Sequence, residues 1–338
     1  MPQQDNRLLE LSAWLEPRLA ELFKRRGWGE VPPATLTAAS SDASFRRYFR
    51  WEAEGRSLVV MDAPPPQEDC RPFVKIAGLL AEAGLHVPEI LAEDLARGFL
   101  LLSDLGRQTY LDVIDEHNAD ALFDDAIRAL IALQQSPVSS ALPAYDEALL
   151  RRELQLFPEW YVQRHLGHSF SPAEQQVWEQ TCRLLIDTAL NQPTVLVHRD
   201  YMPRNLMLST PNPGVLDFQD AVIGPVTYDV TSLFKDAFLS WPEERVQGWL
   251  QQYWESAGTA GIPVQGSYAE FQHASDLMGL QRHLKVIGIF ARICHRDGKP
   301  RYLADVPRFF AYIDEVTARR PELAQLRELL QGLPQVAA

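Results

Sequence analysis

The residues best suited to chemistry in this sequence are an acid, an amide and a second acid in a fixed order. Asp200 follows His198 and Arg199, Asn205 lies on the same segment, and Asp217 comes after it in VLDFQD. Transfer of a phosphoryl group needs a carboxylate that orients the acceptor hydroxyl, and metal ions that neutralise the phosphate oxygens. Amide and carboxylate oxygens are ligands that Mg²⁺ prefers. The pattern therefore predicts Mg²⁺-dependent phosphoryl transfer, with Asp200 as the catalytic residue and Asn205 and Asp217 as metal ligands.

The spacing of these residues follows a known order. His-Arg-Asp, four residues and Asn match the catalytic loop of kinases, and Asp217-Phe218-Gln219 stands where their metal-binding Asp-Phe-Gly element would be. A His-Arg-Asp triplet alone has little weight, because a loop aspartate is often a turn residue or a helix cap. Here the triplet, the asparagine, the second aspartate and the hydrophobic runs around them occur together. We therefore interpret the three residues as functional.

The elements that must position this loop differ between the two parts of the chain. Leucines spaced three or four apart predict a helix over residues 5–26, and residues 34–64 read as short strands, a hairpin plus one more strand. A helix over about 69–83 and strands in VPEILAED and GFLLLSD follow. After LSDLG the pattern becomes mostly helical, with predicted helices over 120–134, 145–165 and 173–190. The loop therefore interrupts a helical region that follows a small sheet.

Composition excludes several classes of protein. The chain has 338 residues and a formal net charge of -13, which argues against a nucleic-acid surface spread over the whole molecule. No run approaches the roughly 18 apolar residues of a membrane helix, and the N-terminus lacks the pattern of an export signal. The three cysteines are widely spaced and give no metal or redox motif. We expect a folded cytoplasmic protein that binds neither nucleic acid nor membrane.

Two segments carry a family resemblance. VLVHRDYMPRNLML and GVLDFQDAVIGPVTYDVTSL resemble the aminoglycoside phosphotransferase and choline kinase family. The resemblance implies an α/β (α+β) fold with two protein-kinase-like lobes, a small antiparallel-sheet N-lobe over residues 1–103 that binds nucleotide and a larger, mainly helical C-lobe over 104–338 for catalysis and substrate binding. It implies the roles given above for the three loop residues. It also gives structural roles to His198 and to Asp229, which would cap a helix and brace the catalytic loop.

A narrower resemblance concerns the acceptor. SDASFRRYFR, LVVMDAPP, EDCRPFVKIAGLLAEAGLHVPEIL and GFLLLSDLG are similar to segments of the bacterial anomeric kinases of N-acetylmuramate and N-acetylglucosamine. This resemblance implies ATP- and Mg²⁺-dependent phosphorylation of the C1 hydroxyl of amino sugars recycled from the cell wall. The expected partner is that small-molecule sugar, and no obligate protein partner is evident.

The phosphate-binding part of the N-lobe departs from the kinase pattern. The sequence lacks a GxGxxG loop, and SDAS takes its place in the hairpin turn, where the hydroxyls of Ser41 and Ser44 could donate to a phosphate. Met61 stands where the phosphate-binding lysine would be. A cation is still needed near the α- and β-phosphates.

Three basic residues are candidates for this cation: Arg46, Arg47 and Lys75. Adjacent residues of a strand point to opposite faces, so only one of the two arginines can face the nucleotide. Farther along the chain, the family resemblance implies that the backbone carbonyl of Asp104 and the amide of Leu105 hydrogen-bond adenine.

A basic segment near the C-terminus bears on the acceptor. Residues 281–310 carry seven lysines and arginines against two aspartates, or +5. Arg282, Lys285, Arg292 and Arg296 share one face of a predicted helix. One interpretation is a solvated face opposite a hydrophobic one. The other is an acceptor pocket in which Arg292 and Arg296 attract an anion such as the lactyl carboxylate of muramate.

Two alternatives remain from the sequence. Another small-molecule kinase of the same family would act on an aminoglycoside, choline or homoserine. A catalytically silent nucleotide-binding module that regulates a partner is suggested by Met61, although the intact Asp200, Asn205 and Asp217 argue against it. A protein kinase is disfavoured, because no activation segment ending in Ala-Pro-Glu follows the second aspartate.

Overall fold

A computed structural model of the chain describes residues 5–40, 45–137, 142–264 and 266–334. Two compact units share the chain: Met1–Gln108 with Met207–Asp220, and Thr109–Leu206 with Ala221–Ala338. Residues 207–220 therefore belong to the first unit, although they come late in the chain. The expected division into residues 1–103 and 104–338 has only one boundary and does not match these two units. The backbone N–H of Val215 donates to the carbonyl of His86 over 2.7 Å and attaches this segment.

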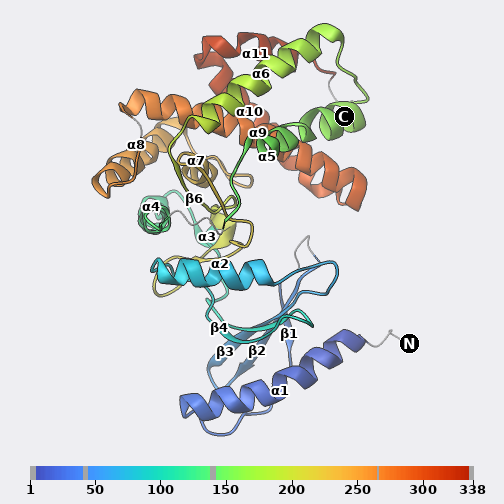
Figure 1. The fold of residues 1–338 in the computed structure, drawn as a ribbon, viewed down its shortest axis with the longest axis vertical. Coiled ribbons are helices and arrows are strands. Elements are labelled where there is room, and N and C mark those ends of the chain that lie inside the picture. Colours follow the sequence, from blue (N-terminus) through green and yellow to red (C-terminus); the bar gives the residue numbers. More distant parts are fainter. Residues whose placement is uncertain (1–4, 41–44, 138–141, 265, 335–338) are drawn as a thin grey trace. The chain divides into compact units, whose positions relative to one another are not determined.

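The first unit is an antiparallel sheet between two helices (Figure 1). The sheet has the order β1-β2-β3-β5-β4. The elements are α1 (Asn6–Arg26), β1 (Thr37–Ser40), β2 (Arg47–Ala53), β3 (Arg56–Asp62), α2 (Arg71–Glu82), β4 (Ile90–Asp94) and β5 (Phe99–Ser103). The predicted helices and strands of this region are therefore confirmed, with helix α1 ending at Gly27, whose φ of 66° lies in the left-handed region.

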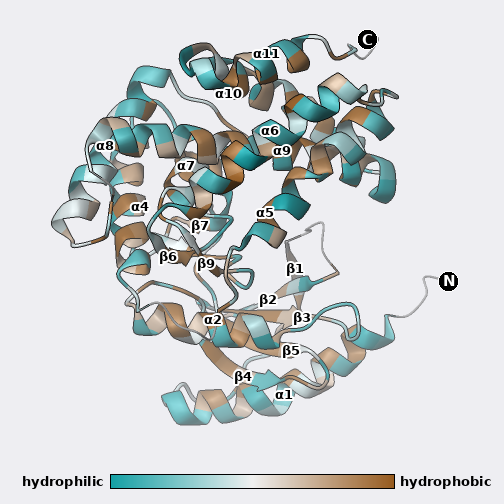
Figure 2. Ribbon diagram, turned by 45° about the horizontal axis from the view of Figure 1, so that its top comes forward, coloured by the Kyte–Doolittle hydropathy of each residue, from teal (hydrophilic) through white to brown (hydrophobic). Residues whose placement is uncertain are grey.

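Alternation along the strands divides the sheet into two faces. Trp51, Val60 and Leu101 pack with the buried face of α1, which contributes Trp14 and Leu15. Because successive strand residues point to opposite faces, Met61 lies on the other face, which α2 covers (Figure 1). Figure 2 shows the hydrophobic residues along these strands. The position expected for a lysine is thus a fully buried methionine.

One carboxylate ties the sheet to α1. Asp62 is fully buried at the end of β3. Its Oδ1 accepts from Arg7 Nε of α1 at 2.7 Å and its Oδ2 from Arg47 Nη2 of β2 at 2.6 Å. Arg47 also pairs with Asp5. A buried carboxylate without cationic partners would cost several kcal/mol, so this cluster fixes both arginines.

The returning segment forms a short hairpin of β7 (Leu206–Met207) and β8 (Gly214–Val215). Its Phe218 packs on Phe73 of α2 with ring centroids 4.8 Å apart. Gly214 leaves room for Leu105, because a Cβ there would lie 2.9 Å from a methyl carbon of that leucine. The hairpin thereby holds Asp217 in the first unit.

The second unit is mainly helical. Its elements are α3 (Tyr110–Val113), α4 (Ala119–Gln134), α5 (Glu147–Leu154), the π-helix η1 (Phe157–His165), α6 (Pro172–Leu190), β6 (Thr194–Val197), the 3₁₀ turn η2 (Pro203–Asn205), β9 (Val222–Pro225), α7 (Tyr228–Phe234), α8 (Glu243–Thr259), α9 (Tyr268–Asp297), η3 (Pro300–Asp305), α10 (Val306–Arg319), η4 (Pro321–Leu323) and α11 (Ala324–Gln331). No helix among the described residues has the length and hydrophobicity to cross a bilayer.

The helical pattern predicted over 145–165 is confirmed, but it is divided into two helices. The structure has α5 and then the separate π-helix η1, with Pro158 in its first turn. Proline lacks the N–H that would continue the α-helical ladder, which explains the break. The helices predicted over 120–134 and 173–190 are confirmed as α4 and α6.

The Asp62 cluster generates a stability prediction. Asp62→Asn leaves Arg7 and Arg47 without their shared anion, so we expect the free energy of unfolding to fall by about 2 kcal/mol in urea titrations. The matched control is Glu89→Gln, which removes the ion pair between Glu89 and Arg26. The side chains of these two residues are 59% and 44% exposed. Exposed pairs contribute at most about 1 kcal/mol. Equal losses in the two variants would contradict the assignment.

Candidate active site

The loop after β6 carries the predicted catalytic residue. β6 pairs with β9 and ends directly before His198, whose side chain is fully buried against Tyr201. The N–H of Asp200 donates to His198 Nδ1 at 3.3 Å, and Asn205 Nδ2 donates to the Asp200 carbonyl at 2.9 Å. The structure therefore brings Asp200 and Asn205 together, with His198 supporting the turn between strand and loop.

The side chain of Asp229 accepts hydrogen bonds from the backbone of the same loop. Its Oδ2 accepts from the N–H of His198 at 2.7 Å and its Oδ1 from the N–H of Arg199 at 3.0 Å. Asp229 is fully buried, and burial raises the pKa of its carboxyl to about 7. The expectation that Asp229 caps a helix is wrong, because Thr227 is the N-cap of α7 and Asp229 lies in the first turn. Its side-chain oxygens instead satisfy loop donors.

Asp217 lies on the returning segment of the first unit, directly before Phe218. Its backbone has a φ of 64°, and its Oδ1 accepts from Gln219 Nε2 at 2.8 Å. The glutamine that replaces the expected glycine thus contacts the carboxylate. Asn205 commits its amide nitrogen to Asp200, so its oxygen is the atom suited to a cation. An amide oxygen and a carboxylate are each ligand types that Mg²⁺ prefers.

The candidate phosphate-binding cations have different surroundings. Arg47 lies on the α1 side of the sheet, held by Asp62 and Asp5. Arg46 Nε lies 3.1 Å from Glu68 Oε2, and both side chains are 14% exposed. Lys75 is exposed on α2. Ser41 and Ser44 lie outside the described residues.

The segment after β5 is fixed by another carboxylate. Asp104 Oδ2 accepts from Arg50 Nε at 2.6 Å, and its Oδ1 accepts from the N–H of Gly106 at 3.0 Å. Burial would raise the pKa of Asp104, but hydrogen bonds from Arg50, Ser57 and Gly106 hold it below its ordinary value. Leu105 is buried between them. The contacts of Asp104 therefore fix the start of this segment.

The basic face of α9 is only partly solvated. Arg282 and Lys285 are 2% and 8% exposed, so the interpretation of a wholly solvated face is wrong. The helix is covered from several sides by its own unit, which periodicity alone does not reveal. Arg296 is exposed and paired with Asp297, with Nε 2.6 Å from Oδ1. Arg292 is half-buried, and its Nε has no hydrogen-bond partner among the described residues.

Sequence reasoning missed Glu153 of α5. This buried carboxylate pairs with Arg199 Nη2 at 2.5 Å and with Lys285 Nζ at 3.0 Å. It therefore joins the catalytic loop to α9. A glutamate within a helical pattern gives no signal of burial, because the same residue type is common on solvated helix faces.

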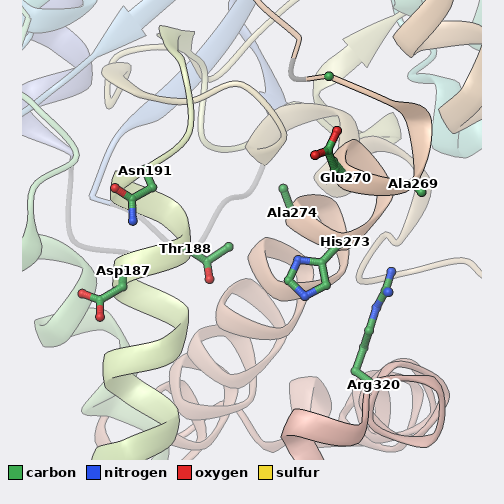
Figure 3. Close-up of a pocket in the computed structure, with 9 residues that line it drawn as sticks. Asp187, Thr188, Asn191, Ala269, Glu270, His273, Ala274 and Arg320 are labelled. Carbon is green, nitrogen blue, oxygen red and sulfur yellow. The ribbon is translucent and has the colours of Figure 1, made fainter.

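A separate hollow of about 760 Å³ lies between α6 and α9 (Figure 3). Asp187 and Asn191 line it from α6, and Glu270 and His273 from α9. His273 Nε2 lies 2.8 Å from Glu322, and Arg320 donates to Asp276 at 2.9 Å. Its lining includes none of the predicted site residues that the structure describes.

Known proteins resemble this chain along most of its length. Residues 35–271 match the model of the phosphotransferase enzyme family. Two relatives named N-acetylmuramate/N-acetylglucosamine kinase, from Pseudomonas putida and Pseudomonas aeruginosa, are 68% and 69% identical over 333 residues, 98% of each chain. A relative of the same name from Caulobacter vibrioides is 31% identical over 94% of this chain and 96% of its own.

Solved structures share the fold. A choline/ethanolamine kinase family protein from Mesorhizobium loti has a TM-score of 0.60 at 15% identity and covers 95% of this chain and all of its own. An ADP-bound aminoglycoside phosphotransferase has a TM-score of 0.56 at 16% identity, covering 87% and 97%. The fold is therefore the α+β, protein-kinase-like fold of small-molecule phosphotransferases. The chain belongs to the phosphotransferase enzyme family.

Asp229 generates a pH prediction. Its carboxyl binds a proton up to about pH 7 in the folded protein, against 3.8 as its ordinary value. The unfolded chain releases this proton earlier, so the stability that Asp229 contributes falls as the pH rises through this window. The amide introduced by Asp229→Asn cannot titrate. We therefore expect the unfolding free energy of the natural protein minus that of the variant to decrease from about pH 4 to about pH 7. A difference that increases with pH would contradict this.

Proposed function

We propose that this protein transfers the terminal phosphoryl group of ATP to the anomeric hydroxyl of N-acetylmuramate and N-acetylglucosamine during cell-wall recycling. One observation carries the proposal: the braced loop with Asp200 and Asn205 occurs in a chain about 68% identical, along nearly its whole length, to a relative named for these two sugars. We place the reaction in the cytoplasm, where ATP is available, and invoke no obligate protein partner.

In this reaction the bond between the terminal phosphorus and the β-phosphate oxygen breaks, and a bond to the sugar C1 oxygen forms. The proton of the sugar hydroxyl passes to Asp200, and ADP leaves. An anomeric hydroxyl is more acidic than an ordinary alcohol, so the orientation that Asp200 gives matters more than its basicity. The hydrogen bond from Asn205 to its carbonyl fixes the backbone of Asp200.

The family resemblance assigns residues to the metal and to the nucleotide. Asn205 and Asp217 would hold Mg²⁺, which supplies neutralisation of the phosphate oxygens when bound. Asp104 and Leu105 would meet adenine through their backbone groups, and Ser41 and Ser44 would donate to phosphate.

Arg46 is our candidate for the phosphate-binding cation. It pairs with Glu68, which orients its guanidinium, whereas Arg47 is committed to Asp62 and Asp5 on the α1 side of the sheet. We therefore retain Arg46 and drop Arg47 from the nucleotide site that the sequence suggested.

The catalytic assignment is tested with Asp200→Asn. We expect turnover to be lost, because the amide cannot accept the hydroxyl proton, while nucleotide affinity stays within about twofold, since the metal-binding and adenine-binding groups are unchanged. The measurements are ADP release with ATP, Mg²⁺ and each sugar, phosphorus NMR of the product, and calorimetry with ADP. The matched control is Asp187→Asn on α6, an exposed aspartate outside the loop. Near-normal turnover in Asp200→Asn would defeat the assignment.

The same assay tests the acceptor. Kanamycin and choline are included beside the two sugars. An anomeric phosphate formed from the amino sugars supports the proposal. Turnover of kanamycin or choline alone would retain the phosphotransferase site and reject the acceptor, and silence with all four would reject the kinase function.

Arg292 generates a prediction about sugar preference. A carboxylate that reaches its half-buried guanidinium would gain a charge-assisted hydrogen bond. We expect Arg292→Leu to lower kcat/KM for N-acetylmuramate by about 10-fold or more, and for N-acetylglucosamine by much less, because only the former carries a lactyl carboxylate. We drop Arg296 from the acceptor pocket that the sequence suggested, because Asp297 already pairs with it at the surface, and Arg296→Leu is therefore the control. Equal losses with both sugars would refute the role of Arg292.

A further inference from the structure

Arg199 has a backbone conformation that its residue type disfavours. Its φ of 77° lies in the left-handed region, which costs a residue with a Cβ free energy unless surrounding contacts enforce it. Two contacts do so. Asp229 accepts from its N–H at 3.0 Å, and Glu153 holds its guanidinium at 2.5 Å. Since Asp200 follows directly, the orientation of the catalytic carboxylate depends on how Arg199 is held.

Glu153 is the centre of a buried group that also includes Lys285. Its Oε1 meets both cations, Arg199 at 2.5 Å and Lys285 at 3.0 Å. Its Oε2 accepts from Tyr145 and from Gln281 Nε2 at 3.2 Å. Glu153 is thus bound at both oxygens, and its side chain is only 6% exposed.

Lys285 extends this group toward α7. Its Nζ donates to the Tyr228 hydroxyl at 3.0 Å, and Tyr228 directly precedes Asp229. Tyr228 also packs edge-on against Tyr145, with ring centroids 5.3 Å apart. One carboxylate on α5 therefore connects the catalytic loop, α9 and the start of α7.

The charges of this group are unequal. Arg199 and Lys285 supply two positive charges and Glu153 one negative charge, which leaves +1 in a buried region. Burial alone would lower the pKa of Lys285, but Tyr228, Glu153 and the carboxylate of Asp200 raise it above its ordinary value.

We propose that Glu153 and Lys285 are positioning residues for catalysis: with Arg199 they form an ion triad that holds the loop backbone and orients the Asp200 carboxylate toward the acceptor hydroxyl. The inference rests on the proposed function, because it assigns the triad to the step in which Asp200 acts. The triad acts through the loop and is assigned no contact with substrate or nucleotide.

A purely structural ion cluster offers the matched control. Lys235, at the C-terminal end of α7, is 6% exposed and pairs with Glu243 at 3.0 Å and Glu315 at 3.3 Å. It makes no contact with the catalytic loop in any interaction described for it. Lys235→Met therefore removes a comparably buried lysine, and we expect a loss of stability with kcat within about twofold of the natural protein.

The experiment compares Lys285→Met, Lys285→Arg, Glu153→Gln and the double variant Glu153→Gln/Lys285→Met with Lys235→Met. We expect Lys285→Met and Glu153→Gln each to lower kcat by about 100-fold with little change in the KM for ATP, because displacement of a reacting group by about 1 Å costs that much. Lys285→Arg keeps the charge and should recover part of this loss. The double variant restores the net charge of +1. Its kcat should therefore be no lower than the kcat of the less active single variant.

The outcomes separate this inference from the proposed function. If Glu153→Gln does not fold, Lys285→Met against Lys285→Arg remains a complete test of the triad. Variants of Lys285 that match Lys235→Met in kcat, while the natural protein phosphorylates an acceptor, would overturn the triad alone. A natural protein that turns over no acceptor would overturn both. Additive losses in the double variant would also reject a group that acts as a unit.

Discussion

The site depends on one contact: the side chain of Asp229 accepts hydrogen bonds from two N–H groups of the loop after β6. The loop after β6 turns sharply, and its first two amide donors point into the protein interior, where they have no strand to pair with. Buried donors without partners are costly, so the loop can keep this shape only if an acceptor stands beneath it. Asp229 supplies two oxygens from the first turn of α7. Packing of α7 thereby determines where Asp200 lies.

Buried carboxylates that accept from several donors occur in both units. Asp62 joins α1 to the sheet, Asp104 fixes the segment after β5, and Glu153 joins the loop to α9. Each is a buried carboxylate that requires several donors and therefore specifies which elements must meet. Hydrophobic burial drives these elements together but does not choose among similar arrangements. The acidic side chains make that choice at the points where these elements meet.

The strand position expected for a phosphate-binding lysine holds a different residue. Met61 occupies the strand position of the usual lysine and is fully buried, so it cannot contact a phosphate through a charge. The proposed replacement is Arg46, which lies just before β2 and pairs with Glu68. Loss of the lysine alone is therefore weak evidence for an inactive module, since the requirement is for positive charge near the phosphates rather than for one residue.

Much of the fold and site could be predicted from the sequence, and the rest was decided only by tertiary structure. Strands, α1, α2, α4 and α6 follow from periodicity and turn residues, because these signals are local, and the spacing of Asp200, Asn205 and Asp217 predicts a catalytic loop. The return of residues 207–220 to the first unit, the burial of Lys285 and the ion pairs of Glu153 depend on partners distant in sequence. A charged residue on a helix has the same sequence pattern whether water or an opposite charge covers it. The family and its loop are therefore determined by the sequence itself, whereas the identity of the side chains that hold the loop in place is determined by packing between distant segments.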